Sequence, residues 1–165
     1  MLTRKNILLT LTAISLCVAL FFFLAPNREK EVKKQLNRLT QYAAKQQDEP
    51  PLTSLTKAAQ IGKLFADPCT LTIRNPEIKG EFSRKEVTDR ILMARNSFSE
   101  MTVSFYDITI QFPVETRAEA LLTMRLLGRM QGEDFADVRE INMTLHKQDR
   151  KWLINGVEFI EVLER

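Results

Sequence analysis

The sequence predicts an α+β domain over residues 28–165, in which N-terminal helices pack on a strongly curved antiparallel sheet, preceded by one transmembrane helix. Two observations predict the domain: helical periodicity dominates residues 28–98, and apolar and polar residues alternate over most of residues 102–163. A third observation, an uncharged apolar run near the N-terminus, predicts the membrane helix. The 165 residues have room for one domain of ordinary size and this appendage.

Composition and charge exclude several classes of protein. Apolar residues make up 44% of the chain and charged residues 27%, which rules out a collagen-like or fully disordered chain. Two cysteines cannot build a disulfide scaffold, and the single histidine, His146, is too few for most histidine metal sites. Arg4 and Lys5 carry two of the three net positive charges, so the rest is close to neutral. We therefore expect no nucleic-acid partner, no metal and no cofactor.

The apolar run covers residues 7–24 and contains no charged residue. As a helix, it would span roughly 27 Å, about the thickness of the hydrocarbon core of a bilayer. A signal peptidase site after Ala25 would put Phe23 at the −3 position, where a small residue is needed. We therefore predict an uncleaved signal anchor over residues 7–25 that contacts membrane lipid, after a short basic N-terminus at residues 1–6.

Two features of this anchor favour opposite orientations. Basic residues are more numerous just after the run than before it, and the positive-inside rule would then keep the domain in the cytoplasm. A short basic N-terminus before one apolar run is instead the layout of a signal anchor that exports the domain behind it. We favour export, which gives a single-pass membrane protein with a periplasmic domain in a bacterium. The basic helix after the anchor either contacts anionic lipid or has a solvated face, and we favour the latter.

The first two helices are predicted on either side of a pair of prolines. The first covers residues 28–47, where apolar residues recur at helical spacing. The prolines end it, and Thr53 or Ser54 caps a second helix that stops at Asp67. The inner stripe of the second helix is expected to consist of Leu55, Ala58, Ala59, Gly62 and Phe65.

A short strand and a third helix come next. Residues 70–74 alternate at period two, which is typical of a half-buried strand, and a turn is expected around Gly80. Ser83 and Glu86 form an S-x-x-E capping box, so a helix begins at this point.

Four long antiparallel strands complete the domain. They are predicted over residues 102–112, 117–130, 135–148 and 152–163. The second of them is rich in good helix formers, but its period-two pattern favours a strand. In the third, alternation puts Ile141 and Met143 on one face and His146 on the other, at the surface. Asn155 and Gly156 predict a β-bulge in the last strand.

This order of elements, together with three local features, resembles the nuclear transport factor 2-like superfamily, also called SnoaL-like or cystatin-like. The features are the helix that ends before Asp67, the Gly80 turn ahead of the Ser83 helix, and the run KWLINGV at residues 151–157, which is similar to the family's final strand. The resemblance covers roughly residues 30–163. It implies a cone-shaped half barrel with an apolar pocket and, in many members, a homodimer through the outer face of the sheet.

The superfamily includes isomerases, dehydratases and cyclases as well as non-catalytic assembly subunits, so the fold does not decide the activity. Its enzymes place acid–base side chains inside the cone. Asp107 is a weak catalytic candidate here, because it shares the face of Phe105 unless Ile108 marks a change of phase that turns it to solvent. The residues expected to line the pocket are Val103, Phe105, Met124, Met143 and Trp152.

We therefore predict a membrane-anchored, non-catalytic binding or assembly module. Its expected partners are a second copy bound through the sheet face, another protein or an apolar small molecule. The alternative is a small-molecule enzyme or carrier, similar to an isomerase, dehydratase or cyclase, that uses the apolar cone.

Overall fold

The computed structural model describes residues 27–74 and 78–162. The elements along the chain are α2 (Arg28–Ala43), α3 (Pro51–Gly62), β1 (Phe65–Ile73), β2 (Ile78–Phe82), α4 (Arg84–Ser97), β3 (Phe98–Val114), β4 (Arg117–Met130), β5 (Glu133–Gln148) and β6 (Lys151–Val162). The predicted anchor, residues 7–25, lies outside the described residues. No helix within the described ranges is long and apolar enough to cross a membrane.

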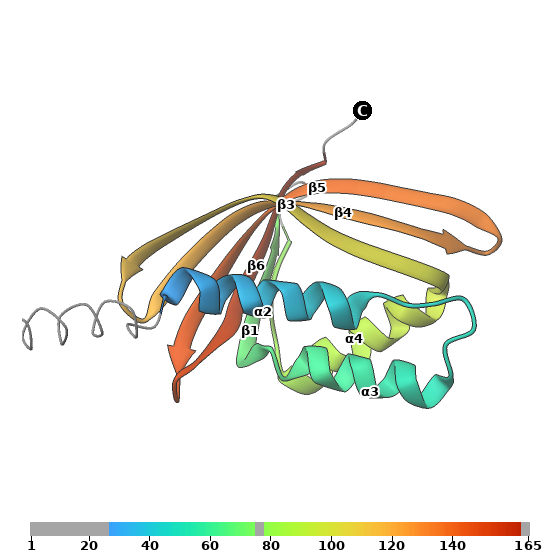
Figure 1. Cartoon of the computed structure of the whole chain (residues 1–165), viewed down its shortest axis with the longest axis horizontal. Coiled ribbons are helices and arrows are strands. Elements are labelled where there is room, and N and C mark those ends of the chain that lie inside the picture. Colours follow the sequence, from blue (N-terminus) through green and yellow to red (C-terminus); the bar gives the residue numbers. More distant parts are fainter. Residues whose placement is uncertain (1–26, 75–77, 163–165) are drawn as a thin grey trace, which may run out of the picture. The chain divides into compact units, whose positions relative to one another are not determined.

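The six strands form one mixed sheet in the order β2-β1-β6-β5-β4-β3 (Figure 1). The four long strands pair antiparallel, as predicted. β1 runs parallel to β6, so the prediction of a purely antiparallel sheet is wrong. The reason lies in the connections: three successive hairpins bring β6 back beside β1 in the same direction. The turn predicted around Gly80 is also wrong, because β2 pairs there with β1.

The boundaries of the helices follow local chemistry in one case and not in another. α4 begins at the predicted capping box, where the Ser83 side chain accepts from the backbone of Glu86 and the Glu86 carboxylate accepts from the Ser83 N–H at 2.8 Å. α3 begins at Pro51, without a side-chain cap, rather than after Thr53 or Ser54. Proline suits the first helical turn, because the N–H that it lacks has no partner there.

The end of α3 and its inner stripe also differ from the prediction. The helix ends at Gly62, and Asp67 lies inside β1 instead of stopping the helix. The buried residues of α3 are Ser54, Ala58, Ile61 and Gly62. Leu55, predicted to face inward, is 48% exposed. The start at Pro51 turns the polar Ser54 inward, where its hydroxyl accepts a hydrogen bond from Arg95 at 3.3 Å.

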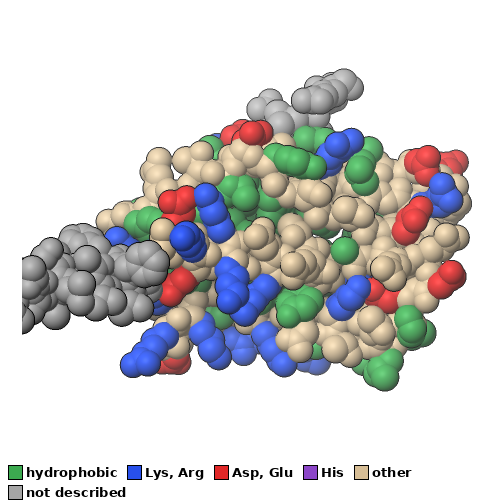
Figure 2. Space-filling view, in the orientation of Figure 1, with side chains coloured by type: hydrophobic (Ala, Val, Ile, Leu, Met, Phe, Trp, Pro, Cys, Tyr) green, Lys and Arg blue, Asp and Glu red, His purple; other side chains and the backbone are tan. Residues whose placement is uncertain are grey.

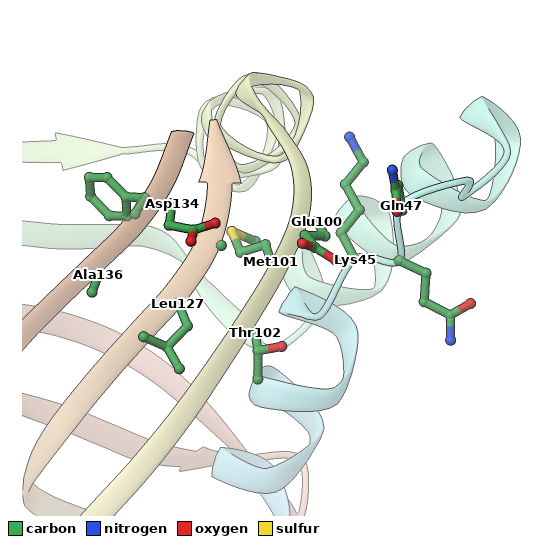
Figure 3. A pocket seen from close by; sticks show the side chains of 11 residues that line it. Lys45, Gln47, Glu100, Met101, Thr102, Leu127, Asp134 and Ala136 are labelled. Carbon is green, nitrogen blue, oxygen red and sulfur yellow. The ribbon is translucent and has the colours of Figure 1, made fainter. Parts of the chain in front are cut away.

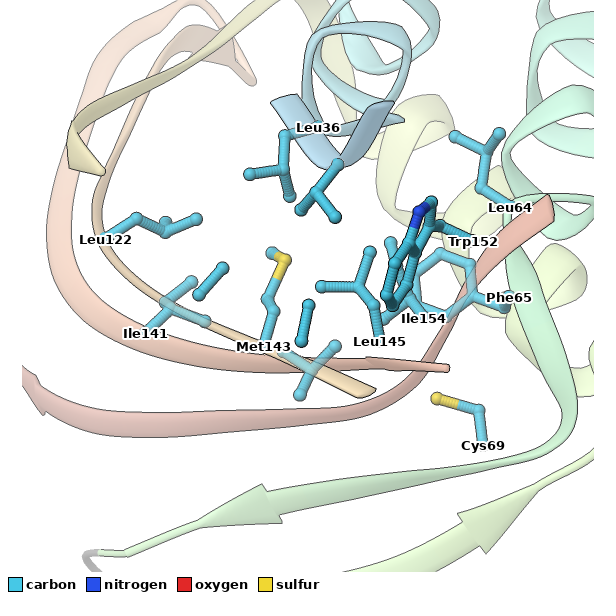
Figure 4. Packing of buried hydrophobic residues seen from close by; sticks show 14 of the residues in the cluster. Leu36, Leu64, Phe65, Cys69, Leu122, Ile141, Met143, Leu145, Trp152 and Ile154 are labelled. Atoms are coloured by element: carbon cyan, nitrogen blue, oxygen red, sulfur yellow. The ribbon is translucent and has the colours of Figure 1, made fainter. Parts of the chain in front are cut away.

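The core lies between α2 and the inner face of the curved sheet (Figure 4). Leu36 of α2 is fully buried and points toward Leu122 and Met143 on the sheet. Trp152 is 3% exposed, and its ring meets that of Phe112 edge-on, with the centroids 5.8 Å apart. The predicted face of the third long strand is confirmed by the burial of Ile141, Met143 and Leu145, and the strand character of the second agrees with the burial of Ala118, Ala120 and Leu122 on one face.

Two of the register shifts in the sheet bear on the sequence predictions. Asn155 has no opposite residue, because its neighbours Ile154 and Gly156 pair with consecutive residues of β5, and this confirms the predicted bulge. In β3, the pairing shifts after Tyr106, and Asp107 has a φ of 52°. This second bulge is the change of phase that was considered for Asp107.

Close approach of two strands explains why position 128 is a glycine. A Cβ atom on Gly128 would lie 2.6 Å from the carbonyl oxygen of Glu100 and 2.8 Å from the ring of Phe98. We expect Gly128→Ala to lower the free energy of unfolding by about 1–3 kcal/mol, measured by urea denaturation, because β3 must move away from β4. Gly156→Ala is the matched control, since its Cβ would meet Thr144 at an ordinary 3.6 Å. Equal losses in the two variants would contradict this steric explanation.

Candidate functional site

The sequence predicts a pocket on the inner face of the sheet. The structure brings the five predicted lining residues to this face as packed side chains. Met143 and Trp152 belong to the buried core, and Phe105 and Met124 are half-buried against it. Val103 is also half-buried, two residues before Phe105 on the same face of β3. Leu36 of α2 points from the helix toward Met143 on this face (Figure 4).

The polar residues that are buried as a whole in the described part of the domain have structural partners. Only Gln35, Ser54 and Arg95 are polar or charged and buried as whole residues among those described. The Gln35 side-chain amide donates to the carbonyl oxygen of Trp152 at 2.8 Å, which ties α2 to β6. Ser54 accepts from Arg95. A general acid or base must reach a substrate proton, and these three side chains are held in hydrogen bonds within the protein instead.

The side chains that could act as acids or bases lie on the surface. Asp107 is exposed at the β3 bulge, and the neighbouring Tyr106 is 48% exposed. His146 is exposed on the outer face of β5, as predicted. The structure therefore does not bring Asp107 together with the five predicted lining residues on the inner face.

A buried ionic cluster, which sequence reasoning missed, joins the three helices. Arg95 is fully buried in α4 and bonds to the carboxylate of Glu49, whose side chain is 3% exposed. Arg95 also donates to the carbonyl oxygens of Tyr42 and Ala43, at 2.7 and 2.5 Å. Lys57 Nζ lies 2.5 Å from the other Glu49 oxygen. Because the cluster joins distant segments through polar atoms, it leaves no periodic signal in the sequence.

The electrostatics of this cluster mark it as a structural clamp. Burial by itself would raise the pKa of Glu49, but hydrogen bonds from Lys57 and Arg95 outweigh burial and hold the pKa below its ordinary range. Glu49 is therefore ionised at neutral pH and cannot donate a proton. Both charged partners are occupied by the loop that connects α2 to α3, so the cluster secures this loop.

A groove of about 640 Å³, which we call the rim groove, lies at the ends of β3, β4 and β5 beside the segment after α2 (Figure 3). The backbones of Lys45 and Met101 exchange hydrogen bonds of 2.8 and 3.0 Å at this place. Lys45 Nζ donates hydrogen bonds to the carbonyl oxygens of Arg95 and Phe98, at 2.8 and 2.6 Å. The groove is lined by Lys45, Gln46, Gln47, Glu100, Met101, Thr102, Leu127, Gly128, Asp134, Phe135 and Ala136.

A second groove of about 560 Å³, the outer groove, crosses the outer face of the sheet from β2 to β4. Lys79, Arg117 and His146 supply cationic or ionisable groups around a floor of small and polar residues. The side-chain oxygen of Asn155 is buried without a hydrogen-bond partner. The floor consists of Thr70, Thr72, Asn142, Thr144, Asn155, Gly156, Val157 and Glu158.

Neither a metal site nor a reactive thiol is present in the residues that the structure describes. No group of three or more His, Cys, Asp or Glu side chains in them could hold a metal ion. Cys69 is 4% exposed in the core, and burial raises the pKa of its thiol to about 11. A protonated, buried thiol is neither a nucleophile nor a good metal ligand.

The helices on one face of this curved sheet define the chain as having the nuclear transport factor 2-like, or cystatin-like, fold. It is similar to a nuclear transport factor 2-like protein with a cystatin-like fold from Novosphingobium aromaticivorans, with a TM-score of 0.62 and 13% identity over 96% of this chain and 90% of that one. No protein-family model matches the sequence, and no curated protein matches it either.

Other structures with this fold differ in their roles. One is the hexachlorocyclohexane dehydrochlorinase LinA, type 3, from Novosphingobium barchaimii, with a TM-score of 0.62 and 6% identity over 82% of this chain and 88% of that one. Another, from Xanthomonas campestris, is a candidate calcium/calmodulin-dependent protein kinase II association domain, with a TM-score of 0.55 and 14% identity over 78% and 80%. At such identities, the likeness concerns the fold alone.

Proposed function

We propose that this chain is a membrane-anchored, non-catalytic binding or assembly module. One observation carries the proposal: the described buried polar residues are held in structural hydrogen bonds, while Asp107 and His146 face away from the core. A catalytic site needs at least two such groups near one substrate atom. The surface of the domain, rather than its interior, then carries the function.

The outer face of the sheet supports assembly with a second copy of the chain. Leu121 is 40% exposed on this face, and Tyr106 is 48% exposed. Asn155 lines the outer groove of the same face. A second chain placed here would bury these apolar side chains. A different protein, bound at the outer groove, is the alternative to a second copy of the chain.

The apolar run at residues 7–24 supports the anchor. On this proposal, the full-length protein stays in the membrane fraction through alkaline carbonate washing. Export predicts that a phosphatase fused after Arg165 is active in a bacterial host. A mature N-terminus near Asn27 would contradict the anchor, and an inactive fusion would reverse the orientation.

Cross-linking in washed membranes tests the assembly. We expect full-length protein with Leu121→Cys, in a Cys17→Ala background, to form a covalent dimer with a short bis-maleimide, because the two outer faces meet around this position. Gln41→Cys, on the exposed side of α2, is the control and should stay monomeric. Asp107→Asn should leave the dimer unchanged. Absence of the Leu121→Cys dimer, or equal cross-linking of the control, would contradict assembly through the sheet.

The alternative, an enzyme or carrier that uses the apolar cone, is tested by the same preparation. Trp152 is the single tryptophan and lies in the core, so its fluorescence reports on the inner face. We expect apolar ring compounds to leave its emission unchanged. A saturable shift in emission would favour the carrier or enzyme instead.

A further inference from the structure

The near-neutral charge of the chain hides a strong asymmetry along it. Residues 28–97 contain 14 Lys and Arg against nine Asp and Glu, whereas residues 98–165 contain eight against twelve. The first part holds all the described helices, and the second part holds the four long strands. The helical side of the domain is therefore positive and the sheet side is negative, a separation that indicates an anionic partner for the helices.

The exposed positive charge is greatest on α2, which contains five Lys and Arg against two Glu. From Val32 onward, α2 contains no acidic residue, and Lys33, Lys34 and Arg38 all lie on its exposed side. α3 contains no acidic residue, but its one cation, Lys57, is bound to Glu49; the exposed Lys63 comes directly after its end. We call these exposed sides of α2 and α3 the basic helical face. Figure 2 shows Lys and Arg side chains gathered over the helices in one view of the molecule.

Two leucines on the same pair of helices are exposed. Leu52 is 74% exposed and Leu55 is 48% exposed, one turn apart at the beginning of α3. In Figure 2, hydrophobic side chains lie at the lower right, over the beginning of α3, and most Lys and Arg side chains lie to the left of them. Helices that lie at a membrane surface combine Lys and Arg with apolar residues that enter the boundary between headgroups and acyl chains.

We propose that the basic helical face docks on an anionic phospholipid surface. One step of this proposal, the tethering of the domain to the membrane, rests on the anchor in the proposed function. Lys34 lies ten residues beyond the end of the apolar run, so even an extended chain holds it within roughly 35 Å of that end. A tether of this length gives a high effective concentration of lipid, so a few charges suffice for binding. The exposed leucines favour lipid over nucleic acid or an acidic protein.

Quenching by spin-labelled lipid tests this docking on the full-length chain. We place an environment-sensitive fluorophore at Asn37→Cys on the exposed side of α2, in a Cys17→Ala background; Cys69 is buried and does not react. The protein is reconstituted into nanodiscs of phosphatidylcholine, with or without about 30 mol% phosphatidylglycerol, and with a nitroxide on the lipid headgroups. We expect at least about threefold stronger quenching in the anionic discs, and its loss near 1 M salt, where the Debye length is about 3 Å.

Two charge-reversal variants separate the effect of the basic helical face from the effect of the total charge of the chain. Lys34→Glu with Arg38→Glu should abolish the effect of anionic lipid. Arg125→Glu with Lys151→Glu changes the net charge equally on exposed residues of the sheet half and should retain it. Equal quenching in both kinds of disc, insensitivity to salt, or equal loss in the two variants would overturn the docking.

Failure of the anchor gives a different result from failure of the docking. Without an anchor, the protein would not remain with the discs after alkaline washing. The same labelled protein is then mixed with vesicles of the two lipid compositions. Quenching that requires anionic lipid and Lys34 with Arg38 would still support the docking, and its absence would overturn it.

Discussion

Replacing Arg95 with methionine is expected to lower the free energy of unfolding by about 3–5 kcal/mol, because it leaves a buried carboxylate without its main partner. Glu49 is 3% exposed and would keep only Lys57, whose side chain is 27% exposed. The carbonyl oxygens of Tyr42 and Ala43 would lose their donor as well. Urea denaturation, followed by Trp152 fluorescence, measures the loss.

Arg90→Met is the matched control on the same helix. Arg90 is exposed and lies over the ring of Phe82, with 4.5 Å between the guanidinium carbon and the ring centroid. Such a contact is worth about 1 kcal/mol or less. Arg95→Met combined with Glu49→Leu should recover part of the stability, because no carboxylate is then buried unpaired. A loss from Arg95→Met no larger than the control would refute the clamp.

Acid titration gives the clamp a second readout. Hydrogen bonds from Lys57 and Arg95 hold the pKa of Glu49 below its unfolded value, so the cluster stabilises the fold above that value. This stability is lost as the pH falls through the lowered pKa, which begins below about pH 4.5. Arg95→Met removes one cause of the lowering, so the variant should be less sensitive to acid over this interval than the unmodified chain.

Local signals predicted the parts of the fold that local chemistry decides. The capping box of Ser83 and Glu86 places the start of α4, because both of its hydrogen bonds close within one turn. Alternation over β4 prevailed over helix propensity, because pairing with two neighbours and burial of one face outweigh a weak intrinsic preference. β2 escaped notice because its five residues include a glycine and two charged side chains.

In the candidate site too, local patterns predicted some features, and contacts between distant segments decided the others. Alternation correctly places Met143 and Trp152 on the inner face, because the side-chain period of a strand is two. It does not say whether the space above them is open. That depends on how closely α2 approaches the sheet and on the length of Leu36, which no pattern within the strands reports (Figure 4). The bulge that turns Asp107 outward depends likewise on a pairing shift with β4.

Trp152→Ala is the second change with a large expected effect. Trp152 is the largest side chain of the inner cluster and is 3% exposed. Its removal deletes the edge-on contact with Phe112 and leaves a cavity that the β-sheet cannot close without breaking pairs on β5 and β1. Large-to-small changes of this kind cost about 3–5 kcal/mol, which is a large part of the stability of a single domain.

Two further variants make the reason for that loss measurable by circular dichroism in urea. Trp152→Phe keeps an aromatic ring against Phe112 and should lose less than the alanine variant, since most of the volume is retained. Leu153→Ala changes the next residue, whose side chain is half-buried on the other face of β6, and should cost less than Trp152→Ala. If the phenylalanine and alanine variants were equally stable, packing of the inner face would not be the cause. A Trp152→Ala variant as stable as the unmodified chain would instead show an inner face with room to spare, which is the arrangement that a small-molecule carrier needs.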